Sequence, residues 1–434
     1  MLKYKYLRCN EYDLMKKRID SEQIFNTFLS YTKINTTSID GSSQLPSCEN
    51  QYKLAEYVVS QFTDIPGVST NIKENAIATI HLPANTLNAP SIVFFAHLDT
   101  APDHSSDTHA LRVRNYNGGI LPFAGSDETF SPDENPELLN YIGQDIVITD
   151  GTSLLGADDK AAIAAGVEAL KYMIKTPTFP HGDIRLVLLP DEETGIRGAK
   201  ALDVGELNSD FGICLDCCET GEYVVENWYA GNARITVRGV TAHPMSAKGK
   251  LVNALCIATE IIAALPEKER PEYTEGREGY YWVHNLRGDT ASATLDIAVR
   301  DFDLKGYKQR KSVLQNIVNR INQRWSSDRI TLVLTDTYEN VKPALDKIPA
   351  ILDNVKKAMH NLGITPKPLI MRGGMMAVLS PQRGCLQLIS LQVRIIFTPS
   401  ESFYLWNPCV LPVKCFWKWL SSVSRRCKNE KMGH

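Results

Sequence analysis

The chain has 434 residues, of which 43% are hydrophobic and 22% charged, and its formal net charge is −3. This is the composition of an ordinary globular protein, and the length favours two domains over one core. The charge gives no basic footprint for nucleic acid or an anionic membrane, and no apolar run reaches the ~20 residues of a spanning helix. The start of the chain lacks an apolar secretion signal, so we expect a cytoplasmic protein.

Apolar periodicity in the first half of the chain predicts an α/β domain. The predicted elements are helices at 21–28, 50–62 and 160–172 and strands at 76–81, 91–96 and 184–190. The strands at 91–96 and 184–190 are continuously apolar, which indicates buried parallel strands. Between them lies a segment rich in Asp, Ser, Pro and Gly, residues 103–140, which we expect to be a polar loop.

A change of pattern at about residue 228 predicts a second, inserted domain. Strands are expected at 232–239, 290–300 and 329–335, and helices at 251–265 and 307–324. This alternation predicts a small α+β, ferredoxin-like unit. The expected domains are a catalytic α/β domain with a mostly parallel central sheet, at 1–227 and 341–434, and a lid or dimerisation domain at 228–340.

Three polar motifs follow or begin beside apolar segments of the first domain. They are His97-Leu-Asp99, Asp158-Asp159-Lys160 and Asp191-Glu192-Glu193. Parallel strands deliver such side chains to one edge of the sheet, where α/β proteins place their sites. One imidazole and several carboxylates suit a pair of zinc or similar divalent ions, whose bound water becomes acidic enough to serve as hydroxide near neutral pH.

Each motif also has a simpler interpretation when it is taken alone. A His-x-Asp pair is often a loop contact, and an acidic triplet is often a solvated turn. Asp158 and Asp159 before a helix are typical of an N-terminal cap that complements the helix dipole. The occurrence of all three motifs in this order, each beside an apolar segment, favours a metal site.

Several segments in register resemble the peptidase T family, the tripeptide aminopeptidases of the two-zinc aminopeptidase and carboxypeptidase clan. The matching segments are AHLDTAPD at 96–103, TDG at 149–151, LLGADDKA at 154–161, HGDI at 181–184, PDEE at 190–193, HPMSAKG at 243–249 and RDFD at 300–303. The similarity runs from about Asp20 to Arg383.

The resemblance implies a role for each matching residue. The implied metal ligands are His97, Asp158 and Asp216 for one zinc and Asp158 and Glu193 for a second. Asp99 would orient His97 and Glu192 would be the general base.

The resemblance also implies substrate-binding residues in the lid and after it. His243 would polarise the scissile carbonyl, Arg300 would help to anchor the peptide, and Arg372 would bind the substrate carboxylate. His243 as a loop cap and Arg300 as a surface ion pair remain open as alternatives. The lid of this family often mediates dimers, so a homodimer acting on short peptides is expected.

The C-terminal segment departs from the family pattern. The family continues Gly-Gly-Thr-Asp-Gly and later supplies a histidine to the second zinc, whereas this chain has Gly374-Met-Met-Ala and no later histidine before His434. If the coding DNA is read two nucleotides later from about Gly384, permitted codons can spell a segment resembling the missing one, histidine included. We hypothesise that a frameshift replaced the tail from about residue 385.

The sequence therefore predicts a zinc-dependent aminopeptidase that releases the N-terminal residue of tripeptides by metal-activated water attack. One alternative is a catalytically impaired relic of this enzyme with a frameshifted C-terminus. Another is a dipeptidase, carboxypeptidase or deacylase of the same clan. Codons behind residues 370–400 that cannot spell the family segment in the shifted frame would rule the frameshift out.

Overall fold

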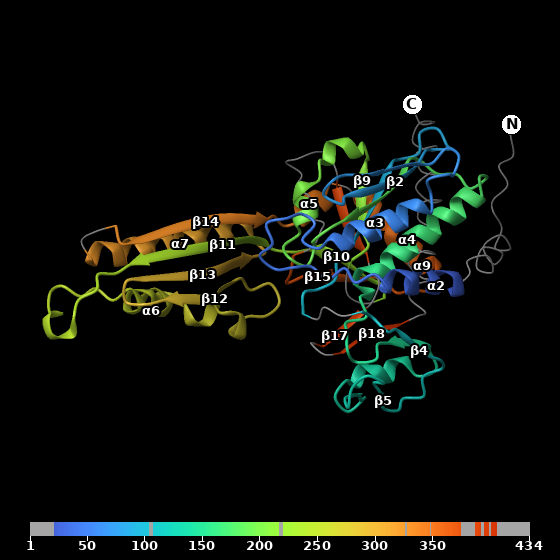
Figure 1. The fold of residues 1–434 in the computed structure, drawn as a ribbon. Helices are drawn as coiled ribbons and strands as arrows, with labels where there is room; N and C mark the ends of the chain where they lie inside the picture. The colour runs from blue at the N-terminus through green and yellow to red at the C-terminus, as the bar shows by residue number, and fades with distance from the viewer. Residues whose placement is uncertain are drawn as a thin grey trace. The chain divides into compact units, whose positions relative to one another are not determined.

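The computed structural model describes residues 21–103, 107–216, 220–325, 328–347 and 349–374, and the backbone of three strands at 387–391, 395–398 and 401–405. Two compact units make up the chain (Figure 1). Unit 1 comprises Met1–Val224, Ala344–Pro368 and Met375–His434, and unit 2 comprises Val225–Pro343 and Leu369–Gly374. Within the described ranges, no helix is long and apolar enough to cross a membrane.

An eight-stranded sheet organises unit 1, in the order β1-β2-β8-β3-β9-β16-β10-β15. The pairs β8–β3, β3–β9 and β9–β16 are parallel, whereas the pairs β1–β2, β2–β8 and β10–β16 are antiparallel. The central strands β3, β8 and β9 are buried and almost wholly apolar, with Arg185 of β8 only partly buried, as expected of strands covered on both faces. The bounds are β1 Ser69–Ile72, β2 Ala78–Leu82, β3 Ile92–His97, β8 Ile184–Leu189, β9 Phe211–Cys214, β10 Glu222–Glu226, β15 Lys367–Ile370 and β16 Gln387–Leu391.

Helix α4, Ala157–Lys175, packs against β3 and β8 of this sheet. Its small residues allow a close approach, since a Cβ atom on Gly166 would lie 3.1 Å from the Leu186 side chain. Asp158 and Asp159 have non-helical backbone angles, so regular helix begins at Lys160, as the sequence predicts. The other helices of unit 1 and its border are α2 Ser21–Thr32, α3 Glu49–Ser60, α5 Arg197–Ala201, η2 Val204–Leu207, α8 Lys342–Leu345 and α9 Pro349–Asn361.

The polar segment 103–140 is not the plain loop that the sequence predicts. It contributes to a sheet in the order β17-β18-β7-β4 and forms a small β5–β6 hairpin. Tyr116, Phe130 and Leu138 are at most 1% exposed in a separate hydrophobic cluster. The prediction was wrong because these apolar residues follow no strand or helix period. The bounds are β4 Leu111–Val113, β5 Leu121–Pro122, β6 Thr129–Phe130, η1 Pro136–Tyr141, β7 Ile146–Ile148, β17 Ile395–Thr398 and β18 Glu401–Leu405.

Unit 2 is an antiparallel four-stranded sheet in the order β12-β13-β11-β14. Helices α6 and α7 contact each other and β13, and with the sheet they enclose one hydrophobic cluster. The chain order β-α-β-β-α-β is that of a ferredoxin-like fold. The bounds are β11 Tyr229–Arg238, η3 Pro244–Ser246, α6 Ala254–Ala264, η4 Glu267–Glu269, η5 Pro271–Tyr273, β12 Tyr280–Gly288, β13 Ser292–Asp301, α7 Leu304–Arg324 and β14 Ile330–Tyr338.

Strand β12 is the strand of unit 2 that the sequence does not predict. It lies at an edge of the sheet and most of its side chains are partly or fully exposed, so its apolar alternation is weak. The α/β unit with its parallel centre and the ferredoxin-like α+β unit confirm the predicted fold class.

Candidate active site

The three polar motifs converge because their strands are neighbours. Strand β3 ends at His97, and β8 and β9 run parallel to it on either side. Their carboxyl ends therefore lie at the same edge of the sheet, where the chain continues into Asp191 after β8 and Asp216 after β9. The first residues of α4 bring Asp158 to the same place.

Three side chains form a potential cation site in unit 1. Ligand atoms of His97, Asp158 and Asp216 all lie within 4.8 Å of one another. His97 is 1% exposed, and its Nε2 atom lies 2.7 Å from Asp158 Oδ1. A buried imidazole with carboxylate oxygens is a donor set that suits zinc and similar divalent ions.

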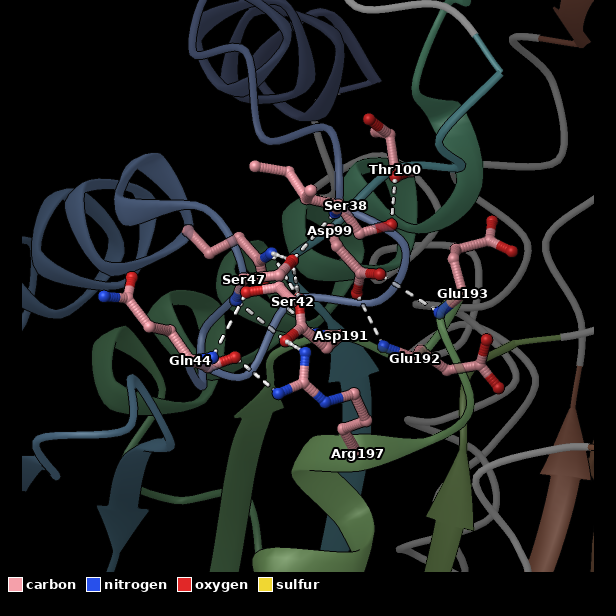
Figure 2. A network of polar contacts seen from close by, with 12 residues as sticks. Ser38, Ser42, Gln44, Ser47, Asp99, Thr100, Asp191, Glu192, Glu193 and Arg197 are labelled. Atoms are coloured by element: carbon pink, nitrogen blue, oxygen red, sulfur yellow. Dashed lines mark hydrogen bonds and ion pairs between the residues drawn. The ribbon is translucent and has the colours of Figure 1, made fainter.

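Asp99 connects two of the polar motifs. Its carboxylate accepts hydrogen bonds from the backbone N–H groups of Glu192, at 2.9 Å, and Glu193, at 3.0 Å. On the other side, its backbone carbonyl lies 2.9 Å from His97 Nδ1, and its Oδ1 atom lies 3.3 Å from the same nitrogen. Asp99 therefore fixes the ring that faces the cation site. It also fixes the backbone of both glutamates, as Figure 2 shows.

Two buried residues of the second motif, Asp159 and Lys160, were not among the predicted site residues. Asp159 is 2% exposed and accepts the backbone N–H of His97 at 3.0 Å. Lys160 is equally buried and donates to the carbonyl of Ile34 at 2.8 Å, and burial lowers the pKa of its ammonium to about 7. The signal for both was their position beside Asp158, but only the folded chain shows that they hold the backbone around the cluster.

The carboxylates of the site carry more negative charge than the surrounding protein groups neutralise. Burial, together with Asp158 among other carboxylates, raises the pKa of Glu193 to about 8 and that of Asp216 to about 7. Burial and Asp216 also raise the pKa of Glu192 well above its ordinary value. Burial lowers the pKa of His97, but Asp158 and its neighbours raise it well above the ordinary value. A bound cation would replace these protons, so the residues fit a divalent metal.

The predicted substrate-binding residues all lie in unit 2, where each makes local contacts. His243 is exposed, and its Nδ1 atom accepts the N–H of Met245 at 3.3 Å, which is the cap contact of the simpler interpretation. Arg300 donates to the carbonyls of Gly231, at 2.6 Å, and Val299, at 3.0 Å. Among the residues that the structure describes, Asp301 pairs with Arg310 rather than with Arg300, so the surface ion pair of the simpler interpretation is not found.

Arg372 lies on an aromatic platform in unit 2. Its guanidinium lies 4.9 Å from the ring centre of Trp228 and 5.8 Å from that of Tyr280. It donates to Thr274 Oγ1 at 2.9 Å and to the carbonyl of Gly276 at 3.2 Å. These contacts hold the planar group in one orientation.

The predicted frameshifted tail lies mostly outside the described residues. Within it, only the backbones of β16, β17 and β18 are described. Strand β16 pairs in parallel with β9, and β18 pairs with β7.

Similarity to known proteins agrees with the geometry of unit 1. The peptidase T-like protein of Yersinia pestis is 39% identical over 363 residues, which cover 82% of this chain and 86% of that protein. Peptidase T of Aliivibrio fischeri is 39% identical over 385 residues, covering 88% and 92%. The chain belongs to the peptidase T family.

Further similarities place this chain among known folds. Residues 226–329 match the family model described as the peptidase dimerisation domain. The structure of the aminopeptidase PepT from Bacillus cereus superimposes with a TM-score of 0.73 at 21% identity, covering 93% of this chain and 99% of that one. A dinuclear metal-binding peptidase of the M20 family from Bacillus subtilis gives 0.62 at 12% identity, covering 93% and 98%. At these identities the likeness shows the fold.

Proposed function

We propose that the chain is a zinc-dependent aminopeptidase that releases the N-terminal residue from tripeptides. Membership of the peptidase T family supports this function, and relatives and structural neighbours carry the names peptidase T and tripeptidase. The observation that carries the proposal is the cluster of His97, Asp158 and Asp216, with Glu192 held beside it through Asp99.

Metal ligation is proposed for four residues. His97, Asp158 and Asp216 would hold one zinc ion, and Asp158 would share a second ion with Glu193. Bound divalent ions would supply water of lowered pKa and positive charge near the scissile carbonyl oxygen. Burial and the repulsion of neighbouring carboxylates, Asp158 first among them, raise the pKa values of Glu193 and Asp216, and this supports a cation among these groups.

Glu192 is the proposed general base. Its carboxylate would take a proton from the attacking water and pass it to the leaving amine nitrogen, so the peptide bond breaks without charge left on the amine. Asp99 would keep Glu192 in place through the backbone N–H of that residue. The ring of His97 would be kept in its orientation by the Asp99 carbonyl.

Unit 2 is proposed to bind the rest of the substrate and a second subunit. His243 would polarise the scissile carbonyl, while Arg300 and Arg372 would bind the peptide and its terminal carboxylate. The orientation of Arg372 on Trp228 supports this role, because a fixed planar guanidinium is suited to a carboxylate. The match of residues 226–329 to a dimerisation domain supports a homodimer. A cytoplasmic location and a role in peptide catabolism are part of the same proposal.

The decisive experiment is the zinc-dependent release of free amino acid from an unblocked tripeptide. This chain is compared with a version whose tail, from residue 384, is restored to the shifted reading frame. Activity in the restored version alone would support the function together with the frameshift, and activity in both would mean that another group completes the second metal site. Zinc-independent activity, or no activity in either version, would contradict the proposed function.

A further inference from the structure

Asp191, the first member of the acidic triplet, has no part in the proposed chemistry, yet it is fully buried, at 0% exposure. Its Oδ1 atom accepts the Ser47 hydroxyl at 2.5 Å and Gln51 Nε2 at 2.7 Å. Its Oδ2 atom accepts the Ser47 backbone N–H at 2.8 Å and Arg197 Nη1 at 3.0 Å. Four donors from three residues therefore saturate this carboxylate. Figure 2 shows Ser47 and Arg197 on either side of it.

The backbone of Asp191 is held as firmly as its side chain. Its N–H donates to Gln51 Oε1 at 3.0 Å, and its carbonyl accepts the N–H of Arg197 at 2.8 Å. Its φ of 51° lies in the left-handed region, which costs energy for a residue other than glycine. The backbone of Gly198 packs closely on the residue before Asp191: its N–H donates to the carbonyl of Pro190 at 3.0 Å, and a Cβ atom on Gly198 would lie 2.3 Å from that oxygen.

The segment that binds Asp191 also binds the strand end that carries Asp99. The backbone N–H and the hydroxyl of Ser38 both donate to the carbonyl of Thr100, at 3.0 Å each. Ser47, nine residues later in the chain, accepts the N–H of Ile39 on its Oγ atom at 2.9 Å, and its hydroxyl donates to Asp191. Residues 36–47 are therefore a clamp, joined at one end to Thr100 and at the other to Asp191.

The two glutamates after Asp191 are thus fixed from two directions. Asp99 accepts their N–H groups, and the clamp residue Ser47 holds the residue immediately before them. Figure 2 shows the side chains of Glu192 and Glu193 directed away from Asp191. The network can therefore set the direction of these side chains without touching a substrate or a metal.

We propose that Asp191, anchored by Ser47 and Gln51, is a positioning residue that sets the backbone of Glu192 and Glu193 for catalysis. The catalytic consequence of this positioning rests on the proposed function. A misplacement of about 1 Å in a reacting group can cost on the order of 100-fold in rate. A network that only stabilised the fold would leave the turnover of the folded enzyme unchanged.

The test substitutes Asp191→Asn in the full chain with the more active of the two tails and uses Asp145→Asn as a matched control. Asp145 also accepts hydrogen bonds from an arginine, Arg112, and from a backbone N–H, that of Asn115. None of its hydrogen bonds within the described ranges goes to a site residue. We expect Asp191→Asn to lower kcat by about 10- to 100-fold, with KM changed less than about threefold. Asp145→Asn should leave kcat and KM unchanged, even if it lowers the melting temperature by as much as Asp191→Asn does.

The double variant Asp191→Asn with Gln51→Glu returns a carboxylate to the pair and should recover at least part of the lost kcat. Hydrogen exchange at the amides of residues 192 and 193 is measured in parallel, since it requires no turnover. We expect faster exchange there in Asp191→Asn and not in Asp145→Asn. If the parent enzyme is active and Asp191→Asn leaves kcat unchanged, or if the exchange rate is unchanged, the positioning role is overturned. If the parent is inactive but Asp191→Asn still speeds exchange at residues 192 and 193, the proposed function is contradicted while Asp191 keeps its role in fixing the loop.

Discussion

The carboxylate of Asp99 accepts a hydrogen bond from the backbone N–H of Glu192 at 2.9 Å, although 93 positions separate the two residues. This bond joins the end of β3 to the loop after β8. Because Asp99 also contacts His97 Nδ1, through its backbone carbonyl at 2.9 Å and its Oδ1 atom at 3.3 Å, one residue links the candidate metal ligand to the proposed base. The chemistry of the site therefore depends on the geometry of two loops together.

The substitution Asp99→Asn tests this link. The substitution turns one carboxylate oxygen into an NH2 group. One of the two hydrogen bonds from the backbone N–H groups of Glu192 and Glu193 is then lost, and that N–H faces another donor. We expect kcat on a tripeptide to fall by about 100-fold, with a smaller change in KM. Steady-state kinetics on protein with an unchanged circular dichroism spectrum checks this, and a larger effect on KM than on kcat would contradict it.

Glu192 and Glu193 should differ in what their loss removes. The substitution Glu192→Gln removes the proposed base, so we expect a fall in kcat of about 10²- to 10⁴-fold with the zinc content retained. The substitution Glu193→Gln should instead reduce the zinc content and restore part of the activity at high zinc. Metal analysis of both purified variants beside their kinetics distinguishes the two roles, and equal zinc contents would refute the assignment.

The stability of the metal-free protein should fall as the pH rises. Burial and neighbouring carboxylates raise the pKa of Glu193 from 4.5 to about 8 and that of Asp216 from 3.8 to about 7. Between pH 5 and 8 the folded protein then holds protons that the unfolded chain has released, so its stability decreases across this window. Urea unfolding with a chelator should show a loss on the order of 1–3 kcal/mol.

Bound zinc should reverse that pH dependence. The metal binds the deprotonated ligands, so its stabilising effect grows as the pH rises through the same window. Urea unfolding with excess zinc at pH 5, 6.5 and 8 provides the comparison. Identical pH profiles with zinc and with chelator would mean that these carboxylates do not bind the ion.

A buried polar network should stabilise unit 2. Asn340 is 7% exposed and its Nδ2 atom donates to the carbonyl of Phe302 at 3.0 Å and to Glu226 Oε1 at 3.2 Å. The substitution Asn340→Ala leaves these buried acceptors with fewer donors, so we expect about 1–3 kcal/mol of lost stability. Asp353→Asn removes an exposed ion pair with Lys356 and should lower the free energy of unfolding by less than about 0.5 kcal/mol. It serves as the control, measured by calorimetry under the same conditions.

Much of the site was predictable because its signals are local in the chain. The apolar runs that became β3 and β8 end on His97 and just before Asp191, and parallel strands must end at one edge. Residue type alone indicated that imidazole and carboxylates there suit a divalent metal. The ferredoxin-like unit followed from the order of its periodic segments, except for the weakly patterned edge strand β12.

Other parts of the site were decided by tertiary structure alone. No spacing in the chain relates Asp191 to Ser47, 144 positions earlier, or Asp159 to the backbone of His97. The same holds for the cluster of Tyr116 and Phe130, whose apolar residues have no period. Periodicity records which face of an element is buried, whereas hydrogen bonds between distant loops depend on how those loops bend. The sequence therefore determined which chemical groups reach the edge of the sheet, and only the folded chain determined which groups hold them there.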